Sequence, residues 1–288
     1  MCRMKFLIVG DLHGHKPLIH YKDFDAIIAP GDFCSDAPRK YMFQSLQEHL
    51  KNPNSKINWY DLTGKKKAIK IIKKSISDGA SVLKKLNSFN VPVYVVPGNW
   101  DWTGDSNSQL NILRKNYYNT INKLSNIIDV HNKLFNVCNY QIIGHGISSG
   151  PEYPQDKKEL KSMKKNELKK LKKAYEKELK NMDYLFKRSS KPLILLSHNI
   201  PFNTSLDKIT NKQSPRYGYH YGSLIARKVI DKYHPLICIG GHMHEHFGKE
   251  KIGKTTVINT GFGPKVNTLL ELEGNKIKKL KFYGKSLS

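Results

Sequence analysis

Residues 6–14 read FLIVGDLHG, an apolar run that ends directly in Asp11 and His13. The run has the composition of a buried strand, and the Asp-x-His spacing places both polar side chains on one side of an extended segment. Four more apolar runs end in residues of the same kinds: Asp32, Asn99, His198, and the pair His242 and His244. Because sites in an open α/β sheet form at the strand ends, these five motifs predict a metal centre with oxygen and nitrogen donors.

Strand-like runs alternate with amphipathic helical patterns, which indicates an α/β architecture. The helical patterns cover residues 65–88, 109–128 and 223–233. The further short strands are expected at residues 140–143, 255–259, 268–273 and 277–283, with a hairpin turn at 273–276. We expect residues 1–288 to form a single domain.

The segment 155–190 is dense in lysine and carries apolar residues near helical spacing. We expect one long helix of about 25–28 residues, about 40 Å at 1.5 Å per residue, as an insertion into the domain. Either its apolar stripe packs on the domain and its lysines are solvated, or it is a basic arm that touches a polyanionic substrate or partner.

The chain is strongly basic, with 49 Lys and Arg residues against 24 Asp and Glu residues and a formal net charge of +25. This charge attracts phosphate esters, nucleic acid or anionic lipid, although a lysine-rich solvated surface explains it equally well. No run approaches the roughly 20 apolar residues of a membrane helix, and the N-terminus reads as a strand rather than a signal peptide. We therefore expect a cytoplasmic protein without a membrane partner, and we make no prediction of its oligomeric state.

The four cysteines form no Cys-x-x-Cys pair: Cys2, Cys34, Cys138 and Cys238. Disulfides are therefore not expected, which fits a reducing compartment. Cys238 lies in an apolar run and is expected in the core, whereas Cys34 is either buried or lines the site.

Two divalent cations about 3.5–4 Å apart can activate a water and clamp a phosphoryl group. Such a pair needs a bridging carboxylate and ligands from several segments. Asp32 suits the bridge because it can offer one oxygen to each ion, and the neutral amide of Asn99 keeps the site from becoming too negative for phosphate. Each motif alone is common, but the five in this order favour a metal site over a set of unrelated structural histidines.

The motif set resembles that of the calcineurin-like metallophosphoesterase superfamily: D-x-H, G-D, G-N-[H/C]-[D/E], H and G-H-x-H. The corresponding segments are Asp11-Leu12-His13, Gly31-Asp32, Gly98-Asn99-Trp100-Asp101, His198 and Gly241-His242-Met243-His244. The stretches SHNIPF (197–202), HYGS (220–223) and GHMHE (241–245) are most similar to Icc-related phosphoesterases of archaea and bacteria. The segments 33–65 and 155–190 depart from the compact pattern of that family.

The resemblance implies a four-layer α/β/β/α sandwich with two mixed β-sheets and two divalent ions, which could be Mn, Fe, Zn or Ni. The ligands implied for one ion are Asp11, His13, Asp32 and His244. Those implied for the second are Asp32, Asn99, His198 and His242.

One departure concerns the leaving group. Many members have a His after the Asn, where this chain has Trp100, which cannot supply a titrating proton. Trp100 is either a packing residue at the cleft wall or a stacking platform for an aromatic group. His220 is the candidate for the missing acid and for substrate binding, because histidine is readily tuned for proton transfer near neutral pH. His145, as a substrate-binding residue, and His15 are further candidates.

The leading hypothesis is hydrolysis of a phosphodiester or phosphomonoester by a metal-activated water, with Asp32, Asn99 and His220 as catalytic residues. Diesters are slightly favoured, because the basic groups that would neutralise a dianionic monoester are not identifiable. A nuclease is an alternative that the charge and Trp100 support, without a recognisable nucleic-acid-binding motif. The rival of another class is a non-catalytic metal-binding scaffold, which the complete ligand set argues against.

Overall fold

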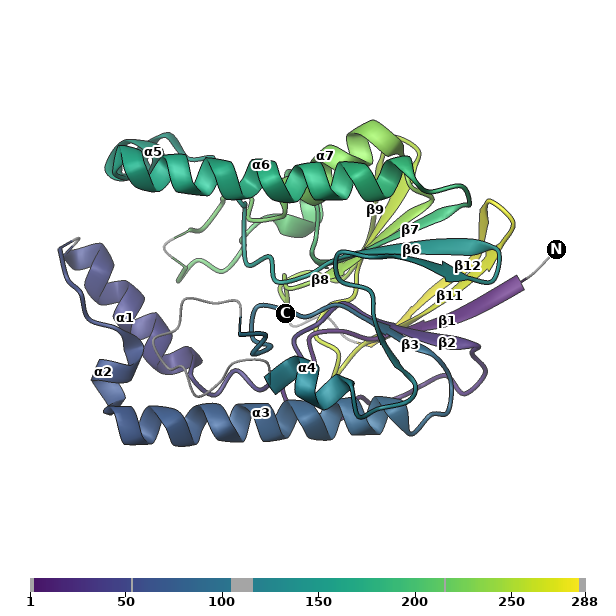
Figure 1. Cartoon of the computed structure of the whole chain (residues 1–288), viewed down its shortest axis with the longest axis horizontal. Coiled ribbons are helices and arrows are strands. Elements are labelled where there is room, and N and C mark those ends of the chain that lie inside the picture. The colour runs from purple at the N-terminus through teal and green to yellow at the C-terminus, as the bar shows by residue number, and fades with distance from the viewer. Residues whose placement is uncertain (1–2, 53, 105–115, 215, 285–288) are drawn as a thin grey trace.

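The computed structural model describes residues 3–52, 54–104, 116–214 and 216–284. Figure 1 shows two β-sheets stacked between two layers of helices. The first sheet contains β1 (Arg3–Ile8), β2 (Ala26–Ala29), β3 (Val93–Val95), β4 (Ile127–Asp129), β11 (Asn267–Glu273) and β12 (Lys276–Tyr283). The second contains β5 (Leu134–Val137), β6 (Tyr140–His145), β7 (Leu193–Asn199), β8 (Ile237–Gly241), β9 (Gly248–Ile252) and β10 (Thr255–Asn259).

Both sheets are mixed. The first has the order β12-β11-β1-β2-β3-β4, and β1 to β4 pair in parallel while β11 is antiparallel to its neighbours. The second has the order β5-β6-β7-β8-β10-β9, with parallel pairs between β6, β7, β8 and β10 and antiparallel pairs at both edges. The parallel strands of each sheet therefore end at a common edge, where the polar motifs lie.

Side-chain alternation along the strands builds the layers. On β1, Phe6 and Ile8 face the second sheet and share one core cluster with residues such as Ile194, whereas Leu7 faces outward and packs with Leu86. A strand covered on both faces is apolar throughout, which explains the continuous runs FLIV and AIIA. Burial of each such side chain contributes about 1.5–3 kcal/mol.

The helices form the two outer layers and one projecting end. They are α1 (Arg39–Lys51), α2 (Trp59–Thr63), α3 (Lys65–Asn87), α4 (Asn116–Ile121), α5 (Lys157–Ser162), α6 (Lys165–Lys187) and α7 (Leu224–Tyr233), with a 3₁₀ turn, η2, at Ser205–Asp207. The helices α3 and α4 cover the first sheet, and α6 and α7 cover the second. The four-layer arrangement with two mixed sheets is confirmed.

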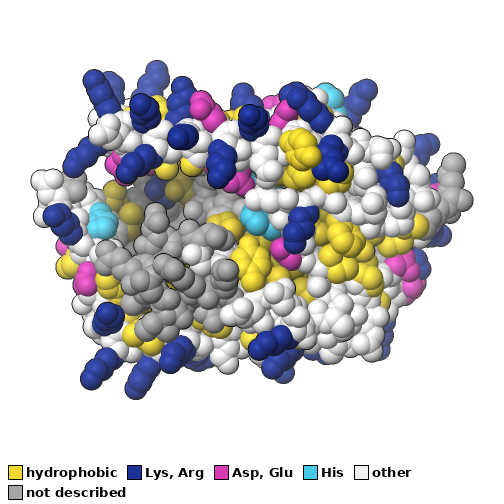
Figure 2. Space-filling model, viewed as in Figure 1, with side chains coloured by type: hydrophobic (Ala, Val, Ile, Leu, Met, Phe, Trp, Pro, Cys, Tyr) yellow, Lys and Arg dark blue, Asp and Glu magenta, His cyan; other side chains and the backbone are white. Residues whose placement is uncertain are grey.

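The lysine-rich segment differs from its expected form. It contains two helices, α5 and α6, because Lys164 adopts an extended conformation (φ −68°, ψ 139°) that interrupts the pattern. Near the C-terminal end of α6, Met182, Leu185 and Phe186 are buried in the core cluster beneath it. The packed interpretation of the apolar stripe is thus confirmed for this end of α6, while Figure 2 shows Lys and Arg side chains crowded along the edge that α5 and α6 form.

Three further expectations need correction. The five motif strands do not belong to one open sheet, because β1, β2 and β3 lie in one sheet and β7 and β8 in the other. The helix expected over 109–128 lies in part outside the described residues, and its end is wrong because Ile127–Asp129 pairs with β3 as strand β4. The hydrophobic pattern of the sequence did not predict helix α1, because this helix has no apolar buried face: its buried residue is Ser45.

The expectation of no disulfide is also wrong. Cys138, in the turn between β5 and β6, is disulfide-bonded, whereas Cys34 and Cys238 are buried free thiols. Spacing along the sequence could not reveal the bond, because residues far apart in the chain meet only in the folded state. Within the described residues, no helix is long and apolar enough to cross a membrane.

Candidate metal centre

The seven predicted ligands come from both sheets. Asp11 and His13 follow β1, Asp32 follows β2 and Asn99 follows β3, while His198 lies in β7 and the pair His242 and His244 follows β8. Four of these residues have positive φ angles, between 45° and 67°: Asp11, His13, Asp32 and His242. Left-handed backbone is uncommon for residues other than glycine and concentrates at functional sites.

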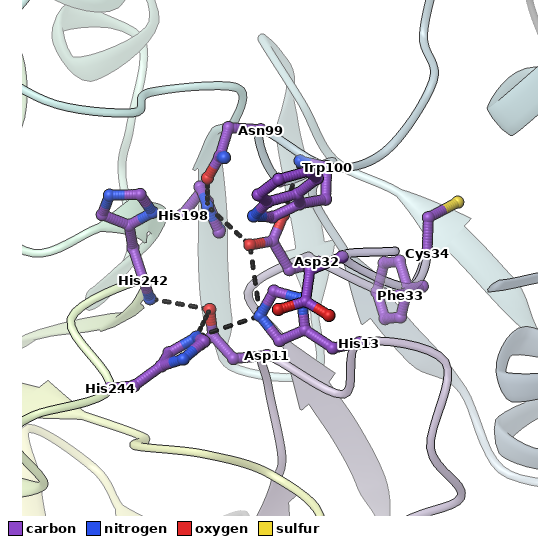
Figure 3. Close-up of polar contacts among 12 residues, drawn as sticks. Asp11, His13, Asp32, Phe33, Cys34, Asn99, Trp100, His198, His242 and His244 are labelled. Atoms are coloured by element: carbon purple, nitrogen blue, oxygen red, sulfur yellow. Dashed lines mark hydrogen bonds and ion pairs between the residues drawn. The ribbon is translucent and has the colours of Figure 1, made fainter. Parts of the chain in front are cut away.

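The donor atoms of these side chains converge in two groups (Figure 3). Ligand atoms of Asp11, His13 and His244 lie within 4.8 Å of one another, as do those of a second group, Asp32, His198 and His242. In the first group, Nε2 of His244 lies 3.0 Å from Nε2 of His13 and 3.3 Å from Oδ1 of Asp11.

Asn99 and Asp32 connect the second group to its surroundings. The Oδ1 atom of Asn99 lies 2.9 Å from Nε2 of His198. Asp32 Oδ2 lies between the groups, 3.6 Å from Nε2 of His13 and 3.6 Å from Nε2 of His198. The structure therefore brings all seven predicted ligand side chains together.

The electrostatics of the cluster suit a cation. Burial, together with neighbouring histidines, lowers the pKa of His13 to about 4 and that of His242 to about 3, so both imidazoles are neutral. Neutral imidazole is the form that binds metal. Burial raises the pKa of Asp32. Burial also acts to raise the pKa of Asp11, but the hydrogen bond with His244 and the electrostatic interactions with the neighbouring histidines together outweigh it, so this pKa is lowered. The buried Oδ2 of Asp11 has no hydrogen-bond partner among the described residues, as expected for a ligand atom.

Asp101 holds the two ligand loops of the first sheet together. Its carboxylate accepts hydrogen bonds from four backbone N–H groups: Gly98 (2.8 Å), Asp32 (2.9 Å), Phe33 (2.9 Å) and Cys34 (3.0 Å). Asp101 belongs to the Gly98-Asn99-Trp100-Asp101 motif, whose sequence does not indicate this role. Because these bonds join residues 32–34 to residues 98–101, Asp101 positions Asp32 and Asn99.

Two glycines and the orientation of the His198 ring also help to position the ligand side chains. A Cβ atom on Gly98 would lie 2.1 Å from Oδ1 of Asp32, and one on Gly241 would lie 1.9 Å from Oδ2 of Asp11. Only glycine fits at these two positions. On the side of the His198 ring that faces away from the cluster, Nδ1 lies 2.7 Å from the carbonyl oxygen of Pro30. Nδ1 is therefore the donor, and Nε2 is directed to the cluster.

The cluster opens into a cleft of about 650 Å³. Besides ligand residues, its walls include Trp100, Tyr221 and two arginines, Arg39 from α1 and Arg216 from the loop before α7. The sequence does not reveal these two basic groups, because neither arginine lies in a recognisable motif and both reach the cleft only through the tertiary fold. Arginine binds phosphate oxygens well.

The other predicted site residues are spread over different environments. Trp100 lines the cleft, with its ring edge-on to His13 at 6.4 Å. His220 lines a second, adjoining pocket instead of the cleft. His145 is buried between Glu152 and Glu178.

Two lesser candidates do not line the cleft. His15 is exposed and lies edge-on to Phe262 at 6.2 Å. Cys34 is buried, and Figure 3 shows its sulfur directed away from the cluster. Burial raises the pKa of this thiol well above its usual value, which argues for a packing role.

A family profile described as metallophosphoesterase, calcineurin superfamily, matches residues 9–282. The chain belongs to this family. This metallophosphoesterase is 25% identical over 261 residues to the uncharacterised protein MJ1162 of Methanocaldococcus jannaschii, a match that covers 89% of this chain and 87% of the relative.

Two solved structures have a similar fold. One is TT1561 of Thermus thermophilus, with a TM-score of 0.54, 14% identity, and coverage of 98% of this chain and 99% of that chain. The other is a dimetal phosphatase from Danio rerio, with a TM-score of 0.50, 10% identity, and coverage of 98% of each chain. At these identities, the likeness establishes the fold of this metallophosphoesterase and nothing finer.

Proposed function

We propose that this chain is a metal-dependent phosphoester hydrolase in which two divalent ions occupy the two neighbouring ligand groups. The observation that carries the proposal is the position of Asp32, whose Oδ2 lies 3.6 Å from a ring nitrogen of His13 in one group and of His198 in the other. A carboxylate between two sets of ligands is what a two-metal site needs as its bridge.

The proposed ligands follow the two groups. One ion takes Asp11, His13, Asp32 and His244, and the second takes Asp32, Asn99, His198 and His242. Oxygen and imidazole donors without a cysteine suit Mn, Fe, Zn or Ni. The two carboxylates only partly offset the charge of two divalent ions, so the loaded site would remain cationic and attract a phosphate ester.

When bound, the ions would polarise the phosphoryl oxygens and make a water nucleophilic near neutral pH. The side chains have separate tasks. Asp101 keeps the loops of Asp32 and Asn99 in place through its four backbone hydrogen bonds. Arg39 and Arg216 would bind phosphate oxygens in the cleft. These arginines are basic groups that can neutralise a dianionic monoester. The cleft therefore suits monoesters as well as diesters, and diesters are no longer favoured.

Leaving-group protonation is the weak part of this machinery. Trp100 lines the cleft and has no titrating proton, and the proposed acid, His220, lies in the adjoining pocket. Esters with acidic leaving groups should therefore react fastest, because a missing general acid costs about 10²–10⁴-fold on poor leaving groups. If His220 supplies the proton, His220→Ala should slow alkyl esters far more than nitrophenyl esters.

The direct test is hydrolysis of bis(4-nitrophenyl) phosphate and 4-nitrophenyl phosphate by protein that has been stripped with a chelator and reloaded with Mn²⁺. We expect activity only in the reloaded protein, and none in Asp32→Asn. The matched control is Asp23→Asn, since this carboxylate is exposed and pairs with Lys5, away from the cluster. A reloaded protein that binds two ions but hydrolyses neither ester would point to the scaffold function instead.

A further inference from the structure

A second pocket of about 590 Å³ adjoins the metal cleft. The two cavities share a wall formed by Arg216 and Tyr221. The guanidinium of Arg216 lies 4.4 Å from the centre of the Tyr221 ring, a cation–π contact that holds the arginine between the cavities. The two cavities are therefore neighbours across this shared wall.

Aromatic rings form one side of the second pocket. Phe202, Tyr219 and His220 line it, and Tyr219 is 45% exposed. The imidazole of His220 is edge-on to Phe202 at 6.1 Å. Exposed rings around a pocket offer faces and edges on which a planar group can stack.

The ring of His220 is fixed by a buried carboxylate. Nδ1 of His220 donates to Oδ1 of Asp207 at 2.6 Å. Asp207 is completely buried and also accepts from the backbone N–H groups of Thr204 (2.8 Å) and Gly222 (2.9 Å). Asp207 is thus a positioning residue that sets the orientation of His220 in the pocket wall.

Acceptors lie on another side of the same pocket. Gln155, Asp156 and Glu159 line it from the start of the lysine-rich segment. Ionised carboxylates only accept hydrogen bonds, so they favour a ligand with N–H donors. They also disfavour a second phosphate, because like charges repel.

Both segments that depart from the compact family pattern contribute to this pocket. Leu50 comes from α1, within 33–65, and Glu159 and Ser162 come from α5, within 155–190. Figure 1 shows α1 and α5 at the same end of the molecule, beyond the sheets. Part of the pocket wall thus comes from segments outside the compact family pattern, whereas Phe202, His220 and Tyr221 lie in the stretches that resemble the family.

We propose that the second pocket binds one ester substituent of the substrate, a planar nitrogen heterocycle with N–H donors. The ring stacks on Tyr219, and a donor meets the carboxylate of Glu159. Arg216 contacts the phosphoester oxygen on the cleft side of the shared wall. This inference rests on the proposed function for the phosphoester group, but the pocket itself can be tested without hydrolysis.

The test compares two esters with the same leaving group: adenosine 5′-(4-nitrophenyl phosphate) and methyl 4-nitrophenyl phosphate. We expect kcat/KM of the Mn²⁺-loaded protein to be at least about tenfold higher for the adenosine ester, the effect of one stacked base. Tyr219→Ala should remove this ratio and Glu159→Gln should reduce it. Tyr184→Ala is the control, because Tyr184 is an exposed tyrosine of α6 that does not line the pocket.

Calorimetric titration with adenosine, which has no phosphate, tests the pocket independently. Binding to the wild-type protein that weakens in Tyr219→Ala supports the inference even if neither ester is hydrolysed, an outcome that would contradict only the proposed function. An adenosine ratio that is unchanged in both Tyr219→Ala and Glu159→Gln would overturn the inference, as would absence of adenosine binding at millimolar concentration.

Discussion

The metal cluster and a single buried histidine, His145, lie at the same edge of the second sheet, and their electrostatics are opposite. The register of β6 and β7 pairs His145 with Ser197, next to His198 of the metal cluster. Burial lowers the pKa of His242 to about 3, whereas Glu152 and Glu178 overcome burial and raise the pKa of His145 to about 9. The metal cluster therefore contains neutral imidazoles, and His145 is an imidazolium.

The difference lies in the partners. Nε2 of His145 is 3.2 Å from Glu152, and Glu152 also accepts from Ser223 Oγ (2.5 Å) and the backbone N–H of Leu224 (2.7 Å) at the start of α7. The His145 imidazole thus lies between two protein carboxylates, hydrogen-bonded to Glu152 and 3.6 Å from Glu178 through Nδ1, and the group joins β6, α6 and α7. In the metal cluster Nε2 of His13 lies 3.0 Å from Nε2 of His244, a spacing at which two neutral imidazoles share a proton or bind a common cation. A buried histidine favours a metal site when several imidazoles converge on shared carboxylates, whereas a single histidine between two carboxylates favours an ion pair.

The largest expected effect is at Asp32. Asp32→Ala should reduce turnover to the background rate and abolish binding of both metals, because the two ions lose their bridge. Metal content by elemental analysis and hydrolysis of bis(4-nitrophenyl) phosphate check this. His145→Gln serves as the comparison, since it removes a buried histidine outside the metal cluster and should keep both metals. Retention of two ions in Asp32→Ala would remove the proposed distinction between the metal cluster and His145.

The next effect concerns the helix that carries Glu178. Met182→Ala should lower the free energy of unfolding by about 2–5 kcal/mol, because Met182 is fully buried beneath α6. Leu168→Ala, at a half-buried position of the same helix, should cost only about 0.5–1 kcal/mol. Urea denaturation measures both. Equal effects would mean that α6 is docked along its whole length, and negligible effects would make the helix an appendage.

The pH dependence of stability separates His145 from the metal cluster more finely. A pKa raised in the folded state, from 6.5 to about 9, means that protonation of His145 stabilises the fold. This stabilisation is complete below pH 6.5 and is lost as the pH rises to about 9, and its size is about 3 kcal/mol. Glu152 and Glu178 face His145 and have lowered pKa values, so they stay ionised throughout this window.

Urea denaturation of the wild type and His145→Gln at pH 6 and pH 9.5 measures this effect. The wild type should lose the additional stability between these values, and the variant should not. A parallel decline in the two proteins would show that His145 is neutral in the folded state, like the histidines of the metal cluster.

The smallest effect is expected at Glu178. Its side chain is 37% exposed and lies 3.6 Å from Nδ1 of His145, so solvent screens the ion pair. Glu178→Gln should cost about 1 kcal/mol or less and should lower the midpoint of the alkaline stability loss. NMR titration of His145 checks the midpoint. A larger loss from Glu178 than from His145 itself would mean that the carboxylate has another structural role.

The local motifs specified most of the metal cluster. Polar residues directly after the apolar runs identify Asp11, Asp32 and Asn99 as strand-end residues, and Asp-x-His or His-x-His spacing pairs donors without knowledge of the fold. The alternation of strand and helix patterns likewise predicted the α/β layers, because a strand covered on both faces must be apolar throughout.

Only the tertiary structure decided which side chains surround those donors. Arg39 and Arg216 carry no motif, and they meet in one cleft because α1 and the loop before α7 fold toward it. His145 has the same strand-end position as a ligand. It is nevertheless a structural cation, because Glu152, from the loop after β6, and Glu178, from α6, lie beside it. Sequence determines the chemistry and the secondary structure of a segment, whereas the pKa and partners of a buried group depend on residues that come close only when the layers pack.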